Sequence, residues 1–396
     1  MGNHLGNPLI AGVGMIPFKK PGQSDSWDTM GANATRLALR DADIPYEDVA
    51  LAFVGYVYAD STAGQSTLYQ VGLSGIPIVN VNNNCATGST ALFLACQAVR
   101  SGAVDVALAV GFEQMIPGSL GLIFDDRKRT MDLLTRRMGE LLGEDTEGPL
   151  DTAKYFGGAG LEHQRRFGTS AHTFAEIAVK ARRHARNNPL ALFQTPLTVT
   201  EVLESRPLYG MLTRYQACAP TCGAAAAVVV SPSYAKKRSL PRLVEVSGQA
   251  MTTDVLSTFD SMIGIVGAGM TKRAADRVYA QAGVGPQDIQ VVELHDCFTS
   301  AEAIFSEALG LCPEGGIEQW VADGGNTYGG SHVVNPSGGL LSKGHPLGAT
   351  GLAQCYELVQ QLRGTADQRQ VPNVRNALAH NTGLGGATVV TMLSQG

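Results

Sequence analysis

Two stretches of the sequence decide its fold: Cys85–Val99 reads "CATGSTALFLACQAV" and His345–Val359 reads "HPLGATGLAQCYELV". A second pair precedes them in the same order, because Ala38–Gly55, "ALRDADIPYEDVALAFVG", is similar to Val278–His295, "VYAQAGVGPQDIQVVELH". Short helices rich in small residues can agree by chance, but two matches in the same order indicate a duplicated chain. In the first pair the identical positions are Gly88, Thr90, Leu92 and Val99 with Gly348, Thr350, Leu352 and Val359.

The rest of the chain alternates strand patterns with helical patterns. Runs such as "VDVALAVGF", "AAAAVVVSP", "IQVVEL" and "ATVVTML" are nearly continuous in Val and Ala, which is typical of strands covered on both faces by helices. We therefore expect an α/β layered fold. If the halves pack about a pseudo-twofold axis, Cys85 and His345 occupy equivalent helix N-termini that meet at a shared site. His295 is then the counterpart of Gly55, at the end of a strand, where ligands of such sheets gather.

The composition describes an ordinary globular chain. Its 396 residues are 44% hydrophobic and 16% charged, and this length suits two domains or one duplicated domain. A net charge of -5 gives no reason to expect a nucleic-acid partner. Seven cysteines at irregular spacing, without a secretory signal, indicate free thiols in a reducing compartment. No run reaches the roughly 18 apolar residues of a membrane span, so we expect a cytoplasmic protein.

Cys85 and His345 are the first candidates for catalysis. The positive end of a helix dipole and its unpaired N–H groups favour the thiolate form of Cys85. A neutral imidazole at His345 can accept the thiol proton, which gives a Cys/His pair. The alternative for a free cysteine is the role of a small buried hydrophobic side chain. That alternative fits the cysteines in or beside apolar helical stretches, Cys96, Cys312 and Cys355.

The motif "ELHDCFTS" places His295, Asp296 and Cys297 directly after an apolar strand. Such groups are unfavourable to bury without partners. We interpret Cys297 as a proton shuttle, His295 as a donor to an oxyanion or the holder of a water, and Asp296 as an orienting group. A metal site is the rival, but no further ligands follow at zinc-like spacing, so we predict no metal. For the same reason Cys218 and Cys222 are interpreted as structural.

Two further segments suggest binding groups. The turn "NTGLGGA", which contains Gly383, can aim backbone N–H groups at a developing negative oxygen, or it can be a plain hairpin turn. Residues 119–189 concentrate Arg and Lys in "DDRKRTMDLLTRRMGE" and "KARRHARNNP". These basic side chains form either a solvated helical face or a lid that offers cations to a phosphorylated ligand.

Together these segments resemble the thiolase superfamily, in particular its sterol-carrier-protein-2 type. The resemblance rests on "NNNCATGSTAL", "ELHDCF", "NPSGGLLSKGHPLGATGLAQC" and "HNTGLGGA", and it covers nearly the whole chain. It implies a five-layered αβαβα fold of two duplicated βαβαβαββ halves with an inserted, mostly helical loop domain. The implied boundaries are 1–118 and 200–238 for the N-terminal half, 119–199 for the loop domain and 239–396 for the C-terminal half.

The resemblance also implies an activity, the cleavage of a 3-oxoacyl-CoA by coenzyme A through an acyl-cysteine, as in fatty acid β-oxidation. Cys85 would be the acylated nucleophile and His345 its activator. Cys297 would be the second acid/base, a task that other thiolases give to a cysteine where this chain has His380. The oxyanion groups would be His295 and the backbone N–H groups of Cys85 and of the Gly383 region.

Further expectations and alternatives follow from the same resemblance. Coenzyme A would be a substrate, so no cofactor is expected, and the Arg and Lys side chains of residues 119–199 would bind it. A homodimer or homotetramer is expected. One alternative is a carbon–carbon bond enzyme of the same fold that acts synthetically or as a retro-aldolase; another is a non-catalytic acyl-CoA or lipid-binding protein. Cys222 stands where the family usually has an aspartate, and we expect this change to affect packing more than chemistry.

Overall fold

A computed structural model describes residues 6–117, 126–145 and 151–395 of the chain. The N-terminal half runs β1 (Leu9–Met15), α1 (Trp27–Ala42), β2 (Leu51–Gly55), α2 (Ala63–Tyr69), β3 (Ile78–Val81), α3 (Thr87–Arg100), β4 (Val106–Glu113) and β7 (Gly223–Val230). The C-terminal half runs β8 (Val244–Thr252), α10 (Ala268–Ala282), β9 (Val291–Glu293), α11 (Thr299–Ala308), β10 (Val333–Val334), α14 (Thr350–Arg363), β11 (Asn376–Gly383) and β12 (Ala387–Gln395). Both halves therefore have the βαβαβαββ order expected from the sequence.

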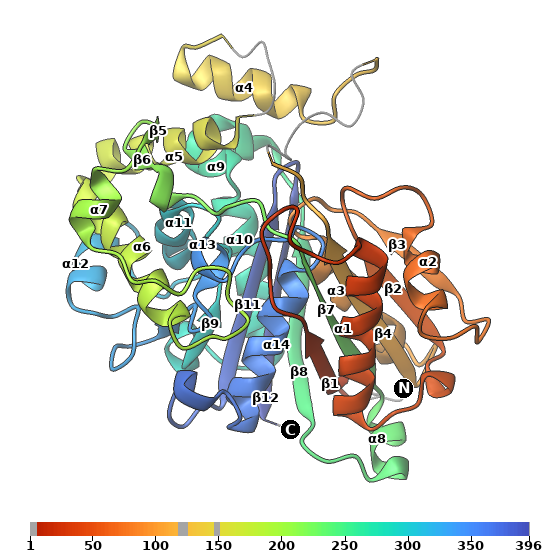
Figure 1. Cartoon of the computed structure of the whole chain (residues 1–396). Helices are drawn as coiled ribbons and strands as arrows, with labels where there is room; N and C mark the ends of the chain where they lie inside the picture. Colours follow the sequence, from red (N-terminus) through yellow and green to blue (C-terminus); the bar gives the residue numbers. More distant parts are fainter. Residues whose placement is uncertain (1–5, 118–125, 146–150, 396) are drawn as a thin grey trace.

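The central sheet shows the duplication directly. Its ten strands are ordered β10-β9-β11-β12-β8-β1-β7-β4-β2-β3, so that each half contributes five neighbouring strands in the same relative order (Figure 1). The halves join where β1 and β8 run antiparallel, through the residue pairs Leu9 with Glu245 and Ile10 with Val244. Within each half, the strand that follows the first long helix pairs in parallel with its neighbours, as β2 does with β3 and β4.

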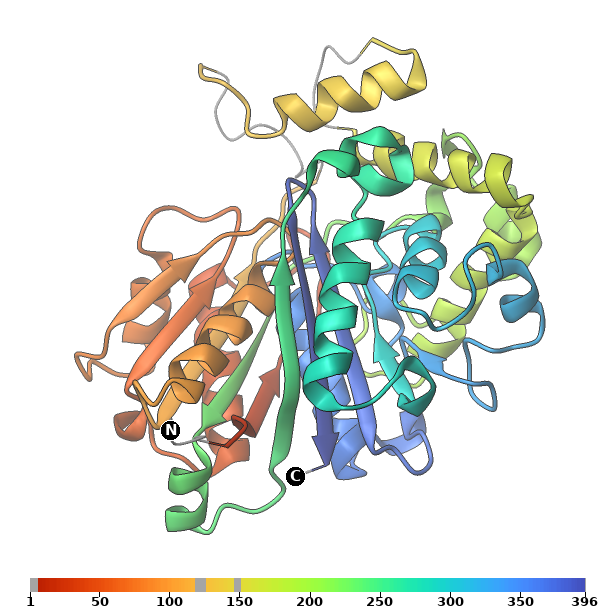
Figure 2. The same cartoon turned by 180° about the vertical axis from the view of Figure 1, so that it is seen from behind.

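The helices form three layers around the two half-sheets. Helix α1 packs on β1 and β7, and its counterpart α10 packs on β8 and β12 (Figure 1; Figure 2). Helices α3 and α14 pack against each other and touch strands of both halves, so they form the middle layer. This is the five-layered αβαβα fold that the resemblance to thiolases implies. The middle helices begin with the residues next to Cys85 and His345, and therefore their position decides where the catalytic groups meet.

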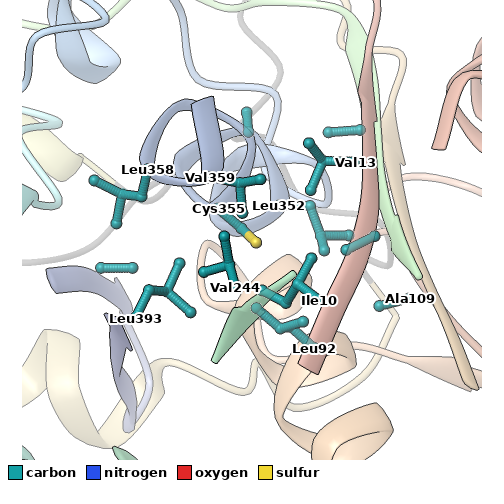
Figure 3. Packing of buried hydrophobic residues seen from close by; sticks show 14 of the residues in the cluster. Ile10, Val13, Leu92, Ala109, Val244, Leu352, Cys355, Leu358, Val359 and Leu393 are labelled. Carbon is teal, nitrogen blue, oxygen red and sulfur yellow. The ribbon is translucent and has the colours of Figure 1, made fainter. Parts of the chain in front are cut away.

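The middle layer contains the main core (Figure 3). Strands β4 and β7 are buried along their whole length, as expected of Val/Ala-rich strands with helices on both faces. Cys355 and Cys96 are fully buried here and behave as small hydrophobic side chains, as the sequence analysis predicted. Large side chains from both halves interdigitate in this cluster: Ile10, Val13, Leu92, Val244, Leu352, Leu358, Val359 and Leu393.

The segment between β4 and β7 carries most of the remaining elements. They are α4 (Asp132–Leu142), α5 (Thr152–Phe167), α6 (Ala171–Ala185), α7 (Val199–Leu203), β5 (Pro207–Tyr209) and β6 (Leu212–Thr213). Short helices elsewhere are α8 (Pro232–Arg238), α9 (Met262–Ile265), α12 (Ile317–Ala322) and α13 (Gly339–Ser342). The boundary predicted at residues 118 and 119 lies outside the described residues. Helices α5 and α6 pack on α11, and thus the inserted segment covers the C-terminal half.

Candidate active site

The N-termini of α3 and α14 bring three of the predicted side chains together. Cys85 precedes α3, His345 precedes α14, and His295 follows β9. The Cys85 sulfur and one ring nitrogen from each histidine all lie within 4.8 Å of one another. The two imidazole rings are 5.1 Å apart between centroids and nearly perpendicular, at 85°. Cys85 lies more than 200 positions from either histidine in the sequence, and the three groups form one cluster because the starts of α3 and α14 meet between the halves.

These side chains line a cavity of about 220 Å³. Its wall is mostly apolar, which suits a hydrocarbon chain better than a charged ligand. Two aromatic rings of the wall, Phe156 of α5 and Phe298, stack at a centroid distance of 5.0 Å. The remaining lining residues are Asn84, Cys85, Met115, Thr152, Cys218, Ala219, Pro220, His295, Cys297, His345, Leu347, Thr382 and Leu384.

The hydrogen bonds of His345 fix it as a proton acceptor. Its Nδ1 lies 2.7 Å from Oγ1 of Thr350, and this hydroxyl donates its one proton to the carbonyl oxygen of Pro346 at 2.9 Å. The hydroxyl must therefore accept from Nδ1–H, which leaves Nε2 unprotonated. Among the described residues Nε2 has no hydrogen-bond partner although it is buried. Its lone pair is available to the Cys85 thiol.

The hydrogen bonds of His295 give the opposite tautomer. The amide nitrogen of Asn381 donates to Nδ1 of His295 at 3.0 Å, so the proton of the neutral ring sits on Nε2. Ser89 fixes the orientation of this amide by donating to the Asn381 oxygen at 3.3 Å. His345 thus offers a base and His295 offers an N–H donor within one cluster. Two imidazoles of opposite tautomer divide the roles of proton acceptor and oxyanion donor.

Burial keeps both imidazoles neutral. It lowers the pKa of His345 to about 3, with a smaller effect from the nearby Lys343 cation. It also lowers the pKa of His295 well below the usual value, and the neighbouring His345 and His380 act in the same direction. Neutral imidazole is the form required of a general base and of a donor to a developing anion.

The resting state of Cys85 differs from the sequence-based expectation. Burial raises the pKa of its thiol to about 12, and the negative charge of Glu113 raises this pKa further. The helix N-terminus was expected to favour the thiolate, but the loss of hydration on burial acts in the opposite direction and outweighs the helix dipole. Cys85 rests as a thiol. A base within reach is then required for attack, and His345 is that base.

Cys297 lines the same cavity but lies outside the tight Cys85–His295–His345 cluster. Burial raises the pKa of its thiol well above the usual value, and the nearby Cys218 and Cys85 thiols add to the shift. The interpretation of Cys218 as purely structural was too simple. Cys218 lies opposite Cys297, with its backbone N–H donating to the Cys297 carbonyl at 2.9 Å, and its side chain forms part of the cavity wall.

Two other polar groups of the motifs face away from the cavity. Asp296 is buried and accepts a hydrogen bond from the Leu340 N–H at 2.6 Å, and burial raises its carboxyl pKa well above the usual value. It therefore anchors the start of α13. The ring nitrogens of His380 are taken by the hydroxyls of Thr271 and Thr382 and, at 3.4 Å, by the His295 backbone N–H.

The glycine-rich turn lies against the start of α3. A Cβ atom on Gly383 would come within 3.3 Å of the Cys85 nitrogen and 3.1 Å of the Ala86 nitrogen. The neighbouring Leu384 carbonyl accepts a hydrogen bond from the Asn84 side chain at 3.1 Å, which ties the turn to the nucleophile. Only glycine fits here, because a Cβ atom would also clash with the Asn83 carbonyl oxygen. That the Gly383 region completes the oxyanion site stays a prediction.

The basic residues predicted to bind a phosphorylated ligand are partly committed to contacts within the chain. Lys180 forms a buried ion pair with Glu302, and Lys154 pairs with Glu144 at 3.0 Å. The Arg137 guanidinium bonds the Phe259 carbonyl at 2.7 Å. The inserted segment does reach the cavity through Thr152 and Phe156 of α5. Phosphate binding by its cations remains a prediction.

The cluster of Cys85, His295 and His345 also has the spacing of a metal site. Among the described residues no fourth histidine, cysteine or carboxylate joins it at this distance. We assign the three groups to acid–base chemistry because the hydrogen bonds of the two rings already give them complementary protonation states, as described above. The residues that sequence reasoning missed are those that set these states, Thr350 and Asn381; the repeat match marked Thr350 as a shared position without revealing its role.

Comparison with known proteins identifies the class to which this fold and site belong. The thiolase N-terminal domain matches residues 9–205 and the thiolase C-terminal domain-like family matches residues 248–395. The chain belongs to the thiolase family and is an acyltransferase that acts on acyl-CoA. Within the family it is of the sterol-carrier-protein-2 type, since it is 50% identical to sterol carrier protein 2 of Oryctolagus cuniculus over 98% of this chain and 72% of that protein.

More distant relatives share the fold. Benzoylsuccinyl-CoA thiolase subunit BbsB of Thauera aromatica is 36% identical over 95% of this chain and 94% of its own length. An Ltp2–ChsH2(DUF35) aldolase structure superposes with a TM-score of 0.82 at 24% identity, covering 98% of each chain. Human mitochondrial 3-ketoacyl-CoA thiolase superposes with a TM-score of 0.74 at 17% identity, covering 99% of each. In the described part of the chain, no helix is both long and apolar enough to cross a bilayer.

Proposed function

We propose that this protein is a 3-oxoacyl-CoA thiolase (acetyl-CoA C-acyltransferase) that cleaves its substrate with coenzyme A. The observation that carries the proposal is the cluster of a thiol, an acceptor imidazole and a donor imidazole within 4.8 Å. Acyl transfer needs these three functions: a nucleophile, a base to activate it, and donors for the negative oxygen. A human mitochondrial 3-ketoacyl-CoA thiolase of the same fold has been solved in complex with CoA, which supports coenzyme A as the ligand.

In the first half-reaction, Nε2 of His345 takes the Cys85 proton and the sulfur attacks the 3-keto carbon. The negative oxygen is held by backbone N–H groups at the start of α3 and beside Gly383. When the carbon–carbon bond breaks, the leaving group is the enolate of acetyl-CoA. The imidazolium of His345 and Nε2–H of His295 stabilise the enolate oxygen, each donor contributing about 3 kcal/mol. The product of this step is an acyl-Cys85 thioester.

Cys297 completes the chemistry. Its S–H group protonates the enolate carbon, which releases acetyl-CoA and leaves a Cys297 thiolate. This thiolate takes the proton from the thiol of an incoming coenzyme A, and the new sulfur anion attacks the acyl-Cys85 thioester. When the tetrahedral intermediate collapses, Cys85 recovers its proton from the His345 imidazolium. All protons balance over one cycle, and the two half-reactions require ping-pong kinetics.

The proposed reaction is tested by trapping the intermediate. Incubation with a 3-oxoacyl-CoA in the absence of free coenzyme A should add one acyl group to Cys85, seen as an increase in intact mass. Cys85→Ala should show neither the adduct nor turnover. CoA-dependent cleavage by this variant would overturn the proposal. Cleavage of a 3-hydroxy substrate without an adduct would instead favour the retro-aldolase alternative, and tight acyl-CoA binding without cleavage the binding-protein alternative.

We also propose a homodimer formed through β3. This strand is the edge of the central sheet and pairs with β2 on one side, which leaves a row of backbone N–H and C=O groups open. Val79 in its centre is 41% exposed, an unusual place for a β-branched apolar side chain at a free edge. A second copy adding its own β3 across a twofold axis would satisfy both features. Light scattering should give a dimer mass, and Val79→Lys should shift the protein toward monomer.

A further inference from the structure

Glu113, the last residue of β4, has a buried carboxylate beneath the turn that carries His345. Its side chain is 1% exposed. One oxygen accepts the Gly348 N–H at 3.0 Å and the Val57 N–H at 3.1 Å, and the other accepts the Tyr58 N–H at 2.9 Å. One carboxylate therefore accepts hydrogen bonds from three backbone N–H groups, two in the loop after β2 and one in the turn before α14. No role was given to this residue in the sequence analysis.

The duplication gives Glu113 a counterpart in the other half. Both β4 and β11 have eight residues and pair in parallel with the equivalent strands β2 and β9, so the last residue of β4 corresponds to Gly383, the last of β11. The loop that Glu113 binds, Val57 and Tyr58, corresponds to Cys297 and Phe298 of the substrate cavity. The Glu113 carboxylate thus lies against the turn before α14, whereas at Gly383 the backbone of residues 83–86 approaches so closely that a Cβ atom would clash with the Asn83 carbonyl oxygen.

We propose that Glu113 is a positioning residue for catalysis: its carboxylate occupies the twin of the substrate site and, as a built-in anion, holds the His345 turn in place. Beside α3, the equivalent position is Gly383, which has no side chain to accept from the equivalent backbone donors. Beside α14, they are satisfied permanently, so the turn that presents His345 does not rearrange as charge develops at Cys85. This inference rests on the proposed function for its turnover readout and on Cys85 reactivity for a second, independent one.

The ionised form of Glu113 is the one that serves three donors, because a protonated carboxyl turns one acceptor into a donor. Burial raises the pKa of Glu113 to about 7, against the effect of its N–H partners. The titratable groups that face it are Tyr58, Cys85 and Cys222, and none of these three gains or loses charge near pH 7, since burial raises the pKa of each. The imidazole of His345 stays neutral there, with its pKa lowered to about 3. In the pH profile, kcat/KM should therefore fall on the acid side with a midpoint near pH 7. This acid limb of the profile is the signature of Glu113.

The first test is Glu113→Gln. Glutamine keeps the shape of the side chain, but its amide N–H groups then face a backbone N–H that the carboxylate accepts from in the wild type. With a 3-oxoacyl-CoA at pH 8, kcat should fall about tenfold or more, as for lost outer partners of a catalytic group, while KM changes less. The acid limb near pH 7 should disappear. A variant with unchanged kcat that keeps the limb would overturn the inference. Circular dichroism and the melting temperature check that the variant is folded.

The second test leaves the Glu113 side chain itself unchanged. The charge of Glu113 is near enough to raise the pKa of the Cys222 thiol, so Cys222→Asp places a carboxyl group within electrostatic range of Glu113. A second acid nearby disfavours ionisation, and the limb should move upward by about half a pH unit or more. If the acid limb does not move, the limb belongs to another group, and the assignment of this pH dependence to Glu113 is overturned. This holds even if Glu113→Gln does not fold.

A substrate-free measurement separates this inference from the proposed reaction. Because Glu113 holds the turn that presents His345 to the Cys85 thiol, iodoacetamide should alkylate Cys85 more slowly in folded Glu113→Gln than in the wild type at pH 8, although the substitution also removes a negative charge that raises the pKa of Cys85. Peptide mapping assigns the alkylated cysteine. If the variant is alkylated more slowly but the wild type does not cleave 3-oxoacyl-CoA, the role of Glu113 is supported and the substrate assignment is overturned. If the wild type is active but the variant is alkylated as fast as the wild type or faster, the reaction stands and the role of Glu113 is overturned.

Discussion

The Nδ1 atom of His345 lies 2.7 Å from Oγ1 of Thr350, the first residue of the helix that His345 precedes. Because that hydroxyl donates to the Pro346 carbonyl, it can accept the ring proton alone. The Thr350 hydroxyl, five positions away, thus determines that Nε2 of His345 is unprotonated and can act as a base toward Cys85. The hydrogen bond lies at the start of α14, but the proton transfer that it permits takes place between the two halves.

Thr350→Val should remove the acceptor for Nδ1–H while it preserves the shape of the side chain. The His345 tautomers then become closer in population, and the unprotonated Nε2 needed for attack is present less often. We expect kcat to fall about 10- to 100-fold with a smaller change in KM. Steady-state kinetics check this. Thr35→Val is the matched control, since Thr35 makes the same bond to the carbonyl four residues earlier, is buried and lies in α1. An equal loss in both variants would contradict the prediction.

Asn381→Asp should invert the tautomer of His295. A carboxylate in place of the amide accepts from Nδ1–H, and it also raises the pKa of the imidazole, which the present surroundings hold low. In the neutral ring Nε2 then loses its proton, and the donor to the enolate oxygen is lost. We expect kcat to fall by roughly a hundredfold or more, as for other tautomer errors at catalytic histidines. A new ionisation of His295, followed by NMR, distinguishes this cause from a general loss of structure.

Cys297→Ala should separate the two half-reactions. Attack by Cys85 does not need the Cys297 thiol, whereas protonation of the enolate and activation of coenzyme A do. Acylation of Cys85, measured by intact mass, should therefore be retained better than turnover. Cys312→Ala serves as the control, because Cys312 is also a buried thiol, at the other end of α11. Loss of acylation and turnover to the same degree would remove Cys297 from the proposed proton path.

The stability of the protein should depend on pH through its buried histidines, and His380 allows a clean test. Burial lowers its pKa to about 3, so below about pH 6.5 the unfolded chain binds a proton that the folded chain does not. Stability from this residue is present above pH 6.5 and is lost as the pH falls. Relative to His380→Gln, the wild type should lose about 1.4 kcal/mol in free energy of unfolding per pH unit. Urea unfolding between pH 4.5 and 7.5 measures this, and parallel curves would contradict it.

Much of the fold and half of the site could be predicted from the sequence. The two repeated stretches fix the duplication, and the duplication places Cys85 and His345 at equivalent helix ends. The strand patterns recovered β4 and β7, because side chains buried on both faces leave a continuous apolar run. The motif after β9 also identified His295 and Cys297 as groups of one cavity. These features are local in the chain or repeated along it, so they can be recognised in the amino-acid sequence.

Other features of the site were missed for a physical reason. Asn381 reaches His295 through the pairing of β11 with β9, and Glu113 reaches Gly348 across the two halves; neither contact leaves a pattern in the sequence. The state of Cys85 was misjudged because a helix dipole can be inferred from sequence whereas desolvation cannot. Cys218 was interpreted as structural, although a backbone hydrogen bond between two loop segments places it beside Cys297.

The sequence by itself determined that two similar halves exist and that a thiol and an imidazole begin equivalent helices. The tertiary structure decided what those groups are at neutral pH. Protonation depends on which polar atoms lie within about 3 Å and on how much water is excluded. Both are properties of packing between segments far apart in the chain, and they exist only after the halves have closed on each other.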